Sequence, residues 1–156
     1  MIDPMPFNFH LLCLIPESFL TITLGIMFLG IYKKWSRIMI ASIIQSVVVY
    51  ILVSNFDILF QSLLNYITLV IFTRLFTGIS WKNSIISIAF AMAISILLKG
   101  TSTLVLLSLT GMTFMEVLLK YWLRFIFLIP YFIGLIVVIV LVRKYQFTIQ
   151  SRLNTN

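Results

Sequence analysis

The sequence SIISIAFAMAISILLKGTSTLVLLSL, residues 84–109, is apolar or small and polar at every position except one. It is long enough to cross the roughly 30 Å hydrocarbon core of a bilayer. The exception is Lys99, and a lysine in such a segment costs about 2.5–3.5 kcal/mol on insertion scales. Small and polar side chains recur every four residues on the face that ends at this lysine: Ser87, Ala91, Ser95 and Lys99. We therefore expect Lys99 to face the protein interior or water, with a partner.

The composition excludes an ordinary soluble domain. Hydrophobic residues make up 62% of the 156 residues and charged residues only 10%, whereas soluble domains average about 45–50% and 25%. A net charge of +7 would suggest a nucleic-acid partner in a soluble protein. Here the basic residues lie at the ends of apolar runs, as membrane topology signals do. We expect a multi-pass membrane protein whose first partner is the lipid bilayer, and no nucleic-acid binding.

The apolar runs predict an all-α transmembrane bundle of five helices in one domain, residues 1–145. The predicted helices cover residues 7–31, 38–53, 58–76, 84–109 and 119–142, with an interfacial turn at 110–116 and a polar cytoplasmic tail at 146–156. The N-terminus lacks a basic segment and a small-residue cleavage site. We therefore expect the first helix to be retained in the mature protein.

The basic residues also predict the orientation. One side of the predicted bundle carries eight of them: Lys33, Lys34, Arg37, Arg74, Lys82, Arg143, Lys144 and Arg152. The other side carries two, Lys120 and Arg124, together with the acidic Asp3, Asp57 and Glu116. Because short cytoplasmic loops are enriched in Lys and Arg, the N-terminus is predicted outside and the C-terminus inside a bacterial cell membrane.

Polar residues of several predicted helices lie at a similar depth. Glu17, Asn65 and Lys99 are about seven to ten residues from the predicted outer ends of their helices, or roughly 11–15 Å. We predict that Glu17 pairs with Lys99 and that Asn65 and Gln45 complete an intramembrane polar network.

Two prolines lie at the same level as this network and are predicted helix hinges. Pro16 interrupts the first helix and Pro130 the last, and prolines in membrane helices kink rather than terminate them. Two structural alternatives stay open. The acid–base pair could hold two helices in register without any ligand, or Lys99-Gly100 could break its helix so that the lysine reaches the interface.

No catalytic, cofactor or metal site is predicted. His10 and Cys13 are three residues apart on one helix, but no third ligand accompanies them. Cys13 is the only cysteine, which excludes an intrachain disulfide. Motifs such as HExxH, GxSxG and a phosphate loop are absent from the sequence. We therefore expect a protein that is not an enzyme.

The chain resembles the membrane region that precedes the catalytic part of some GHKL-type sensor histidine kinases of Gram-positive bacteria. The resemblance covers most of residues 11–145 and lies in these short motifs: Pro16-Glu17, Lys33-Lys34, Leu123-Arg124 and Ile129-Pro130. It implies that the membrane region detects a signal and passes it through the last helix. The sequence holds no phosphoacceptor histidine region or ATP-binding motif, so the resemblance implies a sensor module without its own output domain, acting through a partner or as a truncated relative. Lys99 departs from the family, where a neutral or acidic residue is expected.

The leading functional prediction is a sensing or interaction module that signals through helix movement, together with a protein partner or as a homo-oligomer. Its mechanism would be a shift of the last helix, hinged at Pro130, after a change at Glu17 and Lys99. The alternative is a membrane subunit of a small-molecule transporter that uses the same layer. A purely structural assembly factor is a third interpretation.

Overall fold

The computed structural model describes residues 7–31, 34–55 and 58–145, with side-chain surroundings for residues 11–31, 34–52 and 60–145. Within these ranges the chain forms six α-helices and no strand. They are α1 Phe7–Phe28, α2 Trp35–Asn55, α3 Ile58–Thr77, α4 Trp81–Thr110, α5 Phe114–Leu119 and α6 Tyr121–Tyr145. The all-helical class is confirmed. The predicted tail at 146–156 lies outside the described residues.

Five helices overlap the five predicted ranges, and the short α5 is an addition in the segment expected to be a turn. The C-cap of α4 is Gly111, whose φ of 68° suits a glycine and whose N–H donates to the carbonyl of Leu107. Thr113 then starts α5 through a capping box with Glu116. Because α5 is a separate helix, α6 begins at Tyr121 rather than at the predicted residue 119. It also ends later than predicted, at Tyr145 instead of residue 142.

The longest helix, α4, is continuous through Lys99 and Gly100. The hydroxyl of Thr103 donates to the carbonyl of Lys99 at 2.8 Å, within the same helix. At 1.5 Å per residue the 30 residues of α4 extend about 45 Å. The alternative of a helix break at Lys99-Gly100 is therefore wrong.

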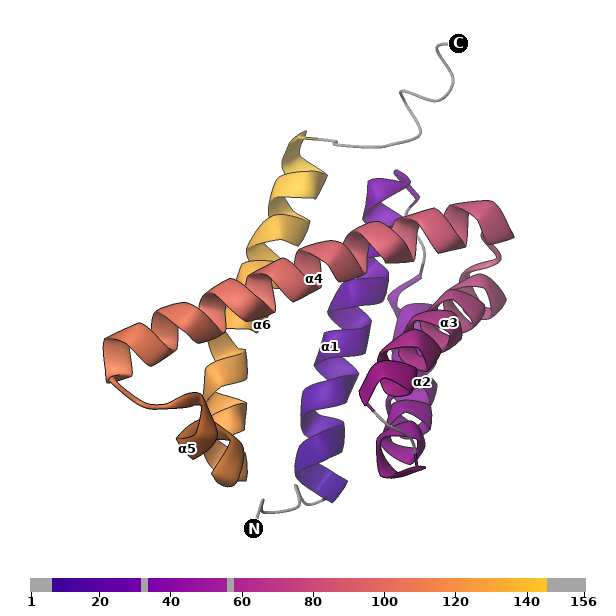
Figure 1. Ribbon diagram of the computed structural model, residues 1–156. Coiled ribbons are helices and arrows are strands. Elements are labelled where there is room, and N and C mark those ends of the chain that lie inside the picture. The colour runs from indigo at the N-terminus through magenta and orange to yellow at the C-terminus, as the bar shows by residue number, and fades with distance from the viewer. Residues whose placement is uncertain (1–6, 32–33, 56–57, 146–156) are drawn as a thin grey trace.

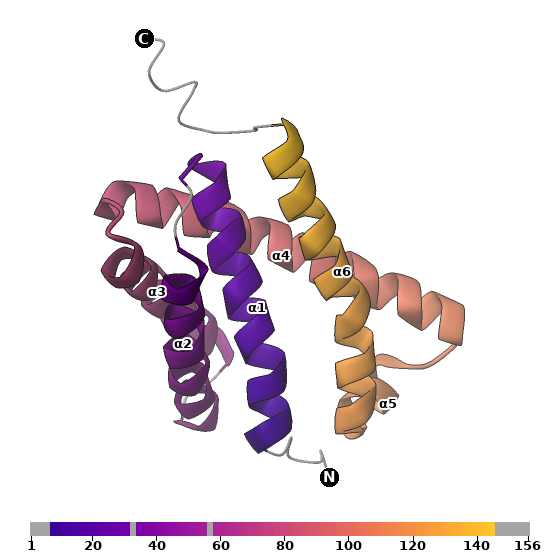
Figure 2. The same cartoon turned by 180° about the vertical axis from the view of Figure 1, so that it is seen from behind.

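The bundle is built around α1, which packs against α2, α4 and α6 (Figures 1 and 2). The α2–α3 pair lies on one side of α1 and α6 on the other. α4 crosses α1 and α6 at a steep angle and contacts α3 as well. One long helix thus connects the two sides of the molecule, and a displacement of α4 alters its contacts with α1, α3 and α6.

The crossing of α1 and α4 depends on small residues. A Cβ added at Gly25 would lie 3.2 Å from the carbonyl oxygen of Ser87 and 3.3 Å from Cδ1 of Ile88. The small and polar stripe of α4 is buried at Ser84, Ser87, Ala91 and Ser95. The four-residue spacing in the sequence therefore marks the face that α4 turns toward the bundle.

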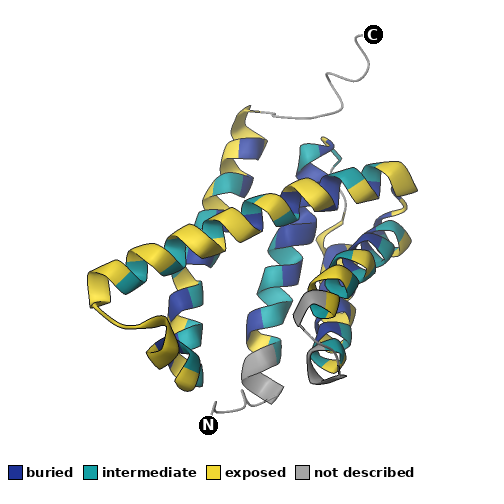
Figure 3. Ribbon diagram, viewed as in Figure 1, coloured by how far each residue is buried: buried dark blue, intermediate teal, exposed yellow. Residues whose placement is uncertain are grey.

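Exposed residues run along most of α4 (Figure 3), and many of them are large and hydrophobic, as are exposed residues of α2 and α6. In the part of the chain that the structure describes, α1, α2, α4 and α6 are long and apolar enough to cross a membrane. The 20-residue α3 carries Gln61, Asn65 and Arg74 and is not among them. Such a bundle is compatible with an integral membrane protein. The five-span count and the orientation stay predictions.

Candidate functional site

The side chains of Glu17 on α1 and Lys99 on α4 meet beside the place where the two helices cross. The Nζ atom of Lys99 lies 3.0 Å from Oε1 of Glu17, and the two form a salt bridge. Glu17 shares a face of α1 with Gly25, two turns further on, and the backbone at Gly25 lies close to Ser87 of α4. The small residue therefore brings α4 close enough for the long side chain of Lys99 to reach the carboxylate.

A tyrosine of α6 joins the pair. The hydroxyl of Tyr131 donates to Oε1 of Glu17 at 3.4 Å, and Nζ of Lys99 lies 5.5 Å from the centre of the Tyr131 ring. Tyr131 is fully buried, so its ring is fixed between the helices. A cation near an aromatic face gains about 0.5–2 kcal/mol. Glu17, Lys99 and Tyr131, which we call the ion-pair group, thus connect α1, α4 and α6.

The ion-pair group is only partly shielded. The side chain of Lys99 is 47% exposed and that of Glu17 25% exposed. Buried ion pairs are costly to form, whereas partly exposed ones lose less hydration and stay accessible. A ligand could therefore reach both charges without first unfolding the bundle.

Gln45 and Asn65 form a second polar group, between α2 and α3. The Nε2 atom of Gln45 donates to Oδ1 of Asn65 at 2.8 Å and to Oγ1 of Thr68 at 2.9 Å. Gln45 is fully buried. The hydrogen bonds found among the described residues do not connect this amide group to Glu17 or Lys99. The four predicted residues are thus distributed over two groups, although Asn65 borders a cavity that the ion pair also borders.

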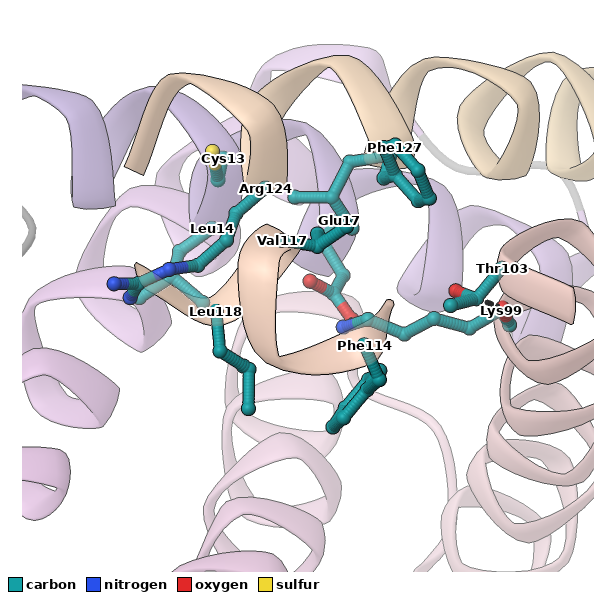
Figure 4. Close-up of a pocket in the computed structure, with 11 residues that line it drawn as sticks. Cys13, Leu14, Glu17, Lys99, Thr103, Phe114, Val117, Leu118, Arg124 and Phe127 are labelled. Carbon is teal, nitrogen blue, oxygen red and sulfur yellow. Dashed lines mark hydrogen bonds and ion pairs between the residues drawn. The ribbon is translucent and has the colours of Figure 1, made fainter. Parts of the chain in front are cut away.

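Two cavities flank the ion pair. The first, of about 320 Å³, lies between α1, α4, α5 and α6 (Figure 4). It is lined mainly by apolar residues with two basic side chains and one acidic one: Cys13, Leu14, Glu17, Lys99, Thr103, Phe114, Val117, Leu118, Arg124, Phe127 and Leu128. The second, of about 300 Å³, lies toward α2 and α3 and includes Ser18, Thr21, Ser62, Asn65 and Ser95. Glu17 and Lys99 belong to both linings, so the pair borders both spaces.

The short helix α5 forms one wall of the first cavity, and its capping box fixes it there. The backbone N–H of Thr113 donates to Oε2 of Glu116 at 2.7 Å, and the hydroxyl of Thr113 donates to the same atom at 3.0 Å. These two bonds, the backbone one first, hold the pKa of Glu116 below its usual value. Glu116 therefore stays a carboxylate under mildly acidic conditions and keeps its hydrogen bonds to Thr113 at the N-terminus of α5.

Pro16 and Pro130 each precede a member of the ion-pair group. Both prolines lie inside continuous helices, α1 and α6. Proline lacks an N–H, so each helix loses one backbone hydrogen bond next to Glu17 or Tyr131. Their role as hinges stays a prediction.

The remaining sequence candidates are Cys13 and His10. Cys13 is buried and lines the first cavity, while the side chain of His10 lies outside the described residues. Among the residues that the structure describes, no three His, Cys, Asp or Glu side chains are grouped to hold a metal ion. The arrangement can bind and orient charged groups of a ligand.

Sequence analysis missed Tyr131, Arg124 and the α5 wall. Tyr131 had a usable signal, because it follows Pro130 at the predicted depth of Glu17 and carries a polar hydroxyl within an apolar helix. The α5 wall had one too, since Thr113 and Glu116 have the spacing of a capping box.

No family model, curated protein or solved structure matches this chain, so its function is inferred from the residues and their geometry.

Proposed function

We propose that this protein is a non-enzymatic sensing or interaction module of the cell membrane that signals by movement of α6. The observation that carries the proposal is the salt bridge of Glu17 and Lys99, which joins α1 to α4, contacts Tyr131 of α6 and borders a cavity. A ligand that changes this pair changes the contact that α6 makes with the rest of the bundle. The proposed output partner is another protein or a second copy of this chain.

The proposed direction of signalling follows the helix. The first cavity lies at the end of the bundle where α6 begins, and α6 ends in Arg143 and Lys144. With the N-terminus outside, as the positive-inside rule predicts, the cavity opens toward the exterior and the basic end of α6 lies in the cytoplasm. The resemblance to sensor kinase membrane regions supports the same direction.

Distances between spin labels test the proposal. In a Cys13→Ser background, labels at Lys144→Cys on α6 and Leu75→Cys on α3 report the position of α6. A control pair at Leu75→Cys and Trp35→Cys reports α2 against α3. Lys144, Leu75 and Trp35 are all exposed in the structure.

Introducing Glu17→Gln should shift the α6 distance distribution in lipid nanodiscs and leave the control distribution unchanged. The reason is that a neutral amide cannot hold Lys99 as firmly, so the link from α4 to α6 through residue 17 is weakened. Identical α6 distributions with and without Glu17→Gln would contradict signalling through this helix.

A membrane subunit of a small-molecule transporter is the second candidate function. It is favoured by the two cavities that the ion pair borders, since transport requires two spaces with a site shared between them. A chain with so few helices would need a second copy or a partner subunit for a complete carrier. Leu14 borders both cavities and provides the test. A Leu14→Cys thiol that reacts with a membrane-impermeant reagent from both sides of a vesicle favours transport, and one-sided reaction favours sensing.

A further inference from the structure

The first cavity has the features of a site for a small ligand rather than a packing defect. Its volume of about 320 Å³ lies at the lower end of the range for ligand sites, roughly 300–1,000 Å³. Most of its lining is apolar, from Leu14, Val117, Leu118, Phe127 and Leu128. The charged groups of Glu17 and Lys99 lie side by side in that lining, and polar groups placed in this way fix the orientation of a ligand.

The ion pair has hydrogen-bonding capacity left over on both charges. Among the described residues, the hydrogen bonds to Glu17 from Lys99 and Tyr131 both end on Oε1. A lysine ammonium has three N–H donors and a carboxylate has two acceptor oxygens. The pair therefore offers donors from Lys99 and an acceptor oxygen from Glu17 side by side to the cavity.

The charge beside the cavity decides the class of ligand. Glu17 and Lys99 sum to zero, so a ligand with one charge would leave one member of the pair uncompensated in an apolar setting. Arg124 also lines the cavity, but its guanidinium extends away from Glu17 and Lys99, on the side of Leu118 (Figure 4). A ligand that carries one positive and one negative group satisfies both members at once. The apolar walls suit an apolar side chain.

We infer that the first cavity binds a small zwitterion with an apolar side chain, of the chemical class of a free aliphatic amino acid. Its carboxylate accepts from Lys99 and its ammonium donates to Glu17, while its side chain contacts Phe127 and Leu128. This inference rests on the proposed function, because it names the ligand of the same ion pair. It also accounts for the partial exposure of the Glu17 and Lys99 side chains.

Equilibrium binding of radiolabelled L-leucine to the purified protein in phosphatidylcholine nanodiscs tests the inference. We expect saturable binding in the micromolar to millimolar range. The competitors are 4-methylpentanoate, which has only the carboxylate, and 3-methylbutylamine, which has only the ammonium. Each should compete at least tenfold more weakly than unlabelled leucine, since each leaves one charge of the pair unmatched.

Two matched variants separate cavity binding from folding. Thr103 lines the first cavity and Thr101 does not, and both hydroxyls donate to the carbonyl four residues earlier on α4. Thr103→Phe should fill the cavity and reduce leucine binding at least tenfold, with the ion pair intact. Thr101→Phe should bind as the unaltered protein does.

Absence of saturable leucine binding, equal loss in both threonine variants, or a carboxylate-only competitor as strong as leucine would overturn the inference. The last outcome would indicate an anion site instead. None of these results bears on the α6 distances, which do not depend on leucine. Failure of the ligand and failure of the proposed signalling are thus distinguished by separate measurements.

Discussion

The two polar groups of this bundle differ in burial and in charge. Gln45, Asn65 and Thr68 form a neutral hydrogen-bonded group between α2 and α3, and Gln45 is fully buried. Glu17 and Lys99 form a charged group between α1 and α4, with side chains 25% and 47% exposed beside two cavities. The neutral group meets these cavities only at Asn65, whereas both members of the charged group line both cavities.

Under the proposed function, this difference separates stability from ligand binding within one helical bundle. The buried amide nitrogen of Gln45 donates to two side chains of α3 and so holds the two helices at a fixed register, although Oε1 of Gln45 is buried without a hydrogen-bond partner among the described residues. An ion pair that is partly exposed beside two cavities contributes less to stability than a fully enclosed one, because its charges are less shielded from competing partners. Such a pair can change partners at low cost, which a binding site needs. Four predictions test the contrast, from the largest expected effect to the smallest.

Gln45→Ala should cause the largest loss of stability, about 2–4 kcal/mol, because it leaves a void and removes the donor from Asn65 and Thr68. Unfolding in mixed micelles measures the loss. Ile44→Ala, next to it on the exposed face of α2, is the control and should change stability by less than about 0.5 kcal/mol. The α6 label distances should not change. A Gln45→Ala protein as stable as the control would show that the amide group contributes nothing.

Lys99→Met should have an intermediate effect on stability, about 1–3 kcal/mol, between the values for exposed and buried pairs. The remaining carboxylate of Glu17 has lost its cation and must be protonated or rehydrated. The same unfolding assay measures this, and the α6 label distances should shift in this variant. A loss larger than that of Gln45→Ala, with unchanged α6 distances, would assign the pair a structural role only.

Gly25→Ala should destabilise by about 1 kcal/mol, since its Cβ would lie 3.2 Å from the backbone oxygen of Ser87 and the two helices would have to move slightly apart. Gly100→Ala is the matched control on α4, because nothing lies within 4 Å of a Cβ at Gly100. That control should be neutral or more stable by up to about 1 kcal/mol, as expected for alanine in a helix. Thermal unfolding in detergent compares them, and equal effects would exclude a tight crossing.

The smallest effect concerns the capping box of α5. The lowered pKa of Glu116 means that its carboxylate stabilises α5 at pH values above its usual pKa of 4.5. This contribution is lost as the pH falls through the lowered pKa of the folded state. Glu116→Gln should therefore reduce the pH dependence of stability below pH 4.5. Fluorescence of the adjacent Trp122 during thermal unfolding measures it. Identical acid profiles for the two proteins would mean that the capping box is absent in solution.

The helices were predictable because their signals are local. Apolar runs of spanning length and basic turns located all five long helices to within a few residues, and the spacing from Ser87 to Ser95 located the buried face of α4. Helix ends depended on caps, and the capping box of Thr113 and Glu116 was read as part of a turn. As a result α5 was missed and the start of α6 was placed too early.

The arrangement of the site was less predictable than its residues. Depth along each helix placed Glu17 and Lys99 at one level, and the structure brings them to 3.0 Å. Depth alone carries no information about rotation or crossing angle, so Gln45 and Asn65 were assigned to the same network rather than to a separate group on α2 and α3. The steep path of α4 and the packing of Tyr131 depend on tertiary contacts, which periodicity in a single helix cannot report.

A double-mutant cycle of Glu17→Gln and Lys99→Met tests the ion-pair group most directly. Unfolding free energies of the original protein, the two single variants and the double variant give the coupling energy between the side chains. We predict a coupling of about 1–2 kcal/mol, with the double variant less destabilised than the sum of the singles. Additive losses, with no coupling beyond about 0.3–0.5 kcal/mol, would show that the two charges do not support each other in the membrane-embedded protein.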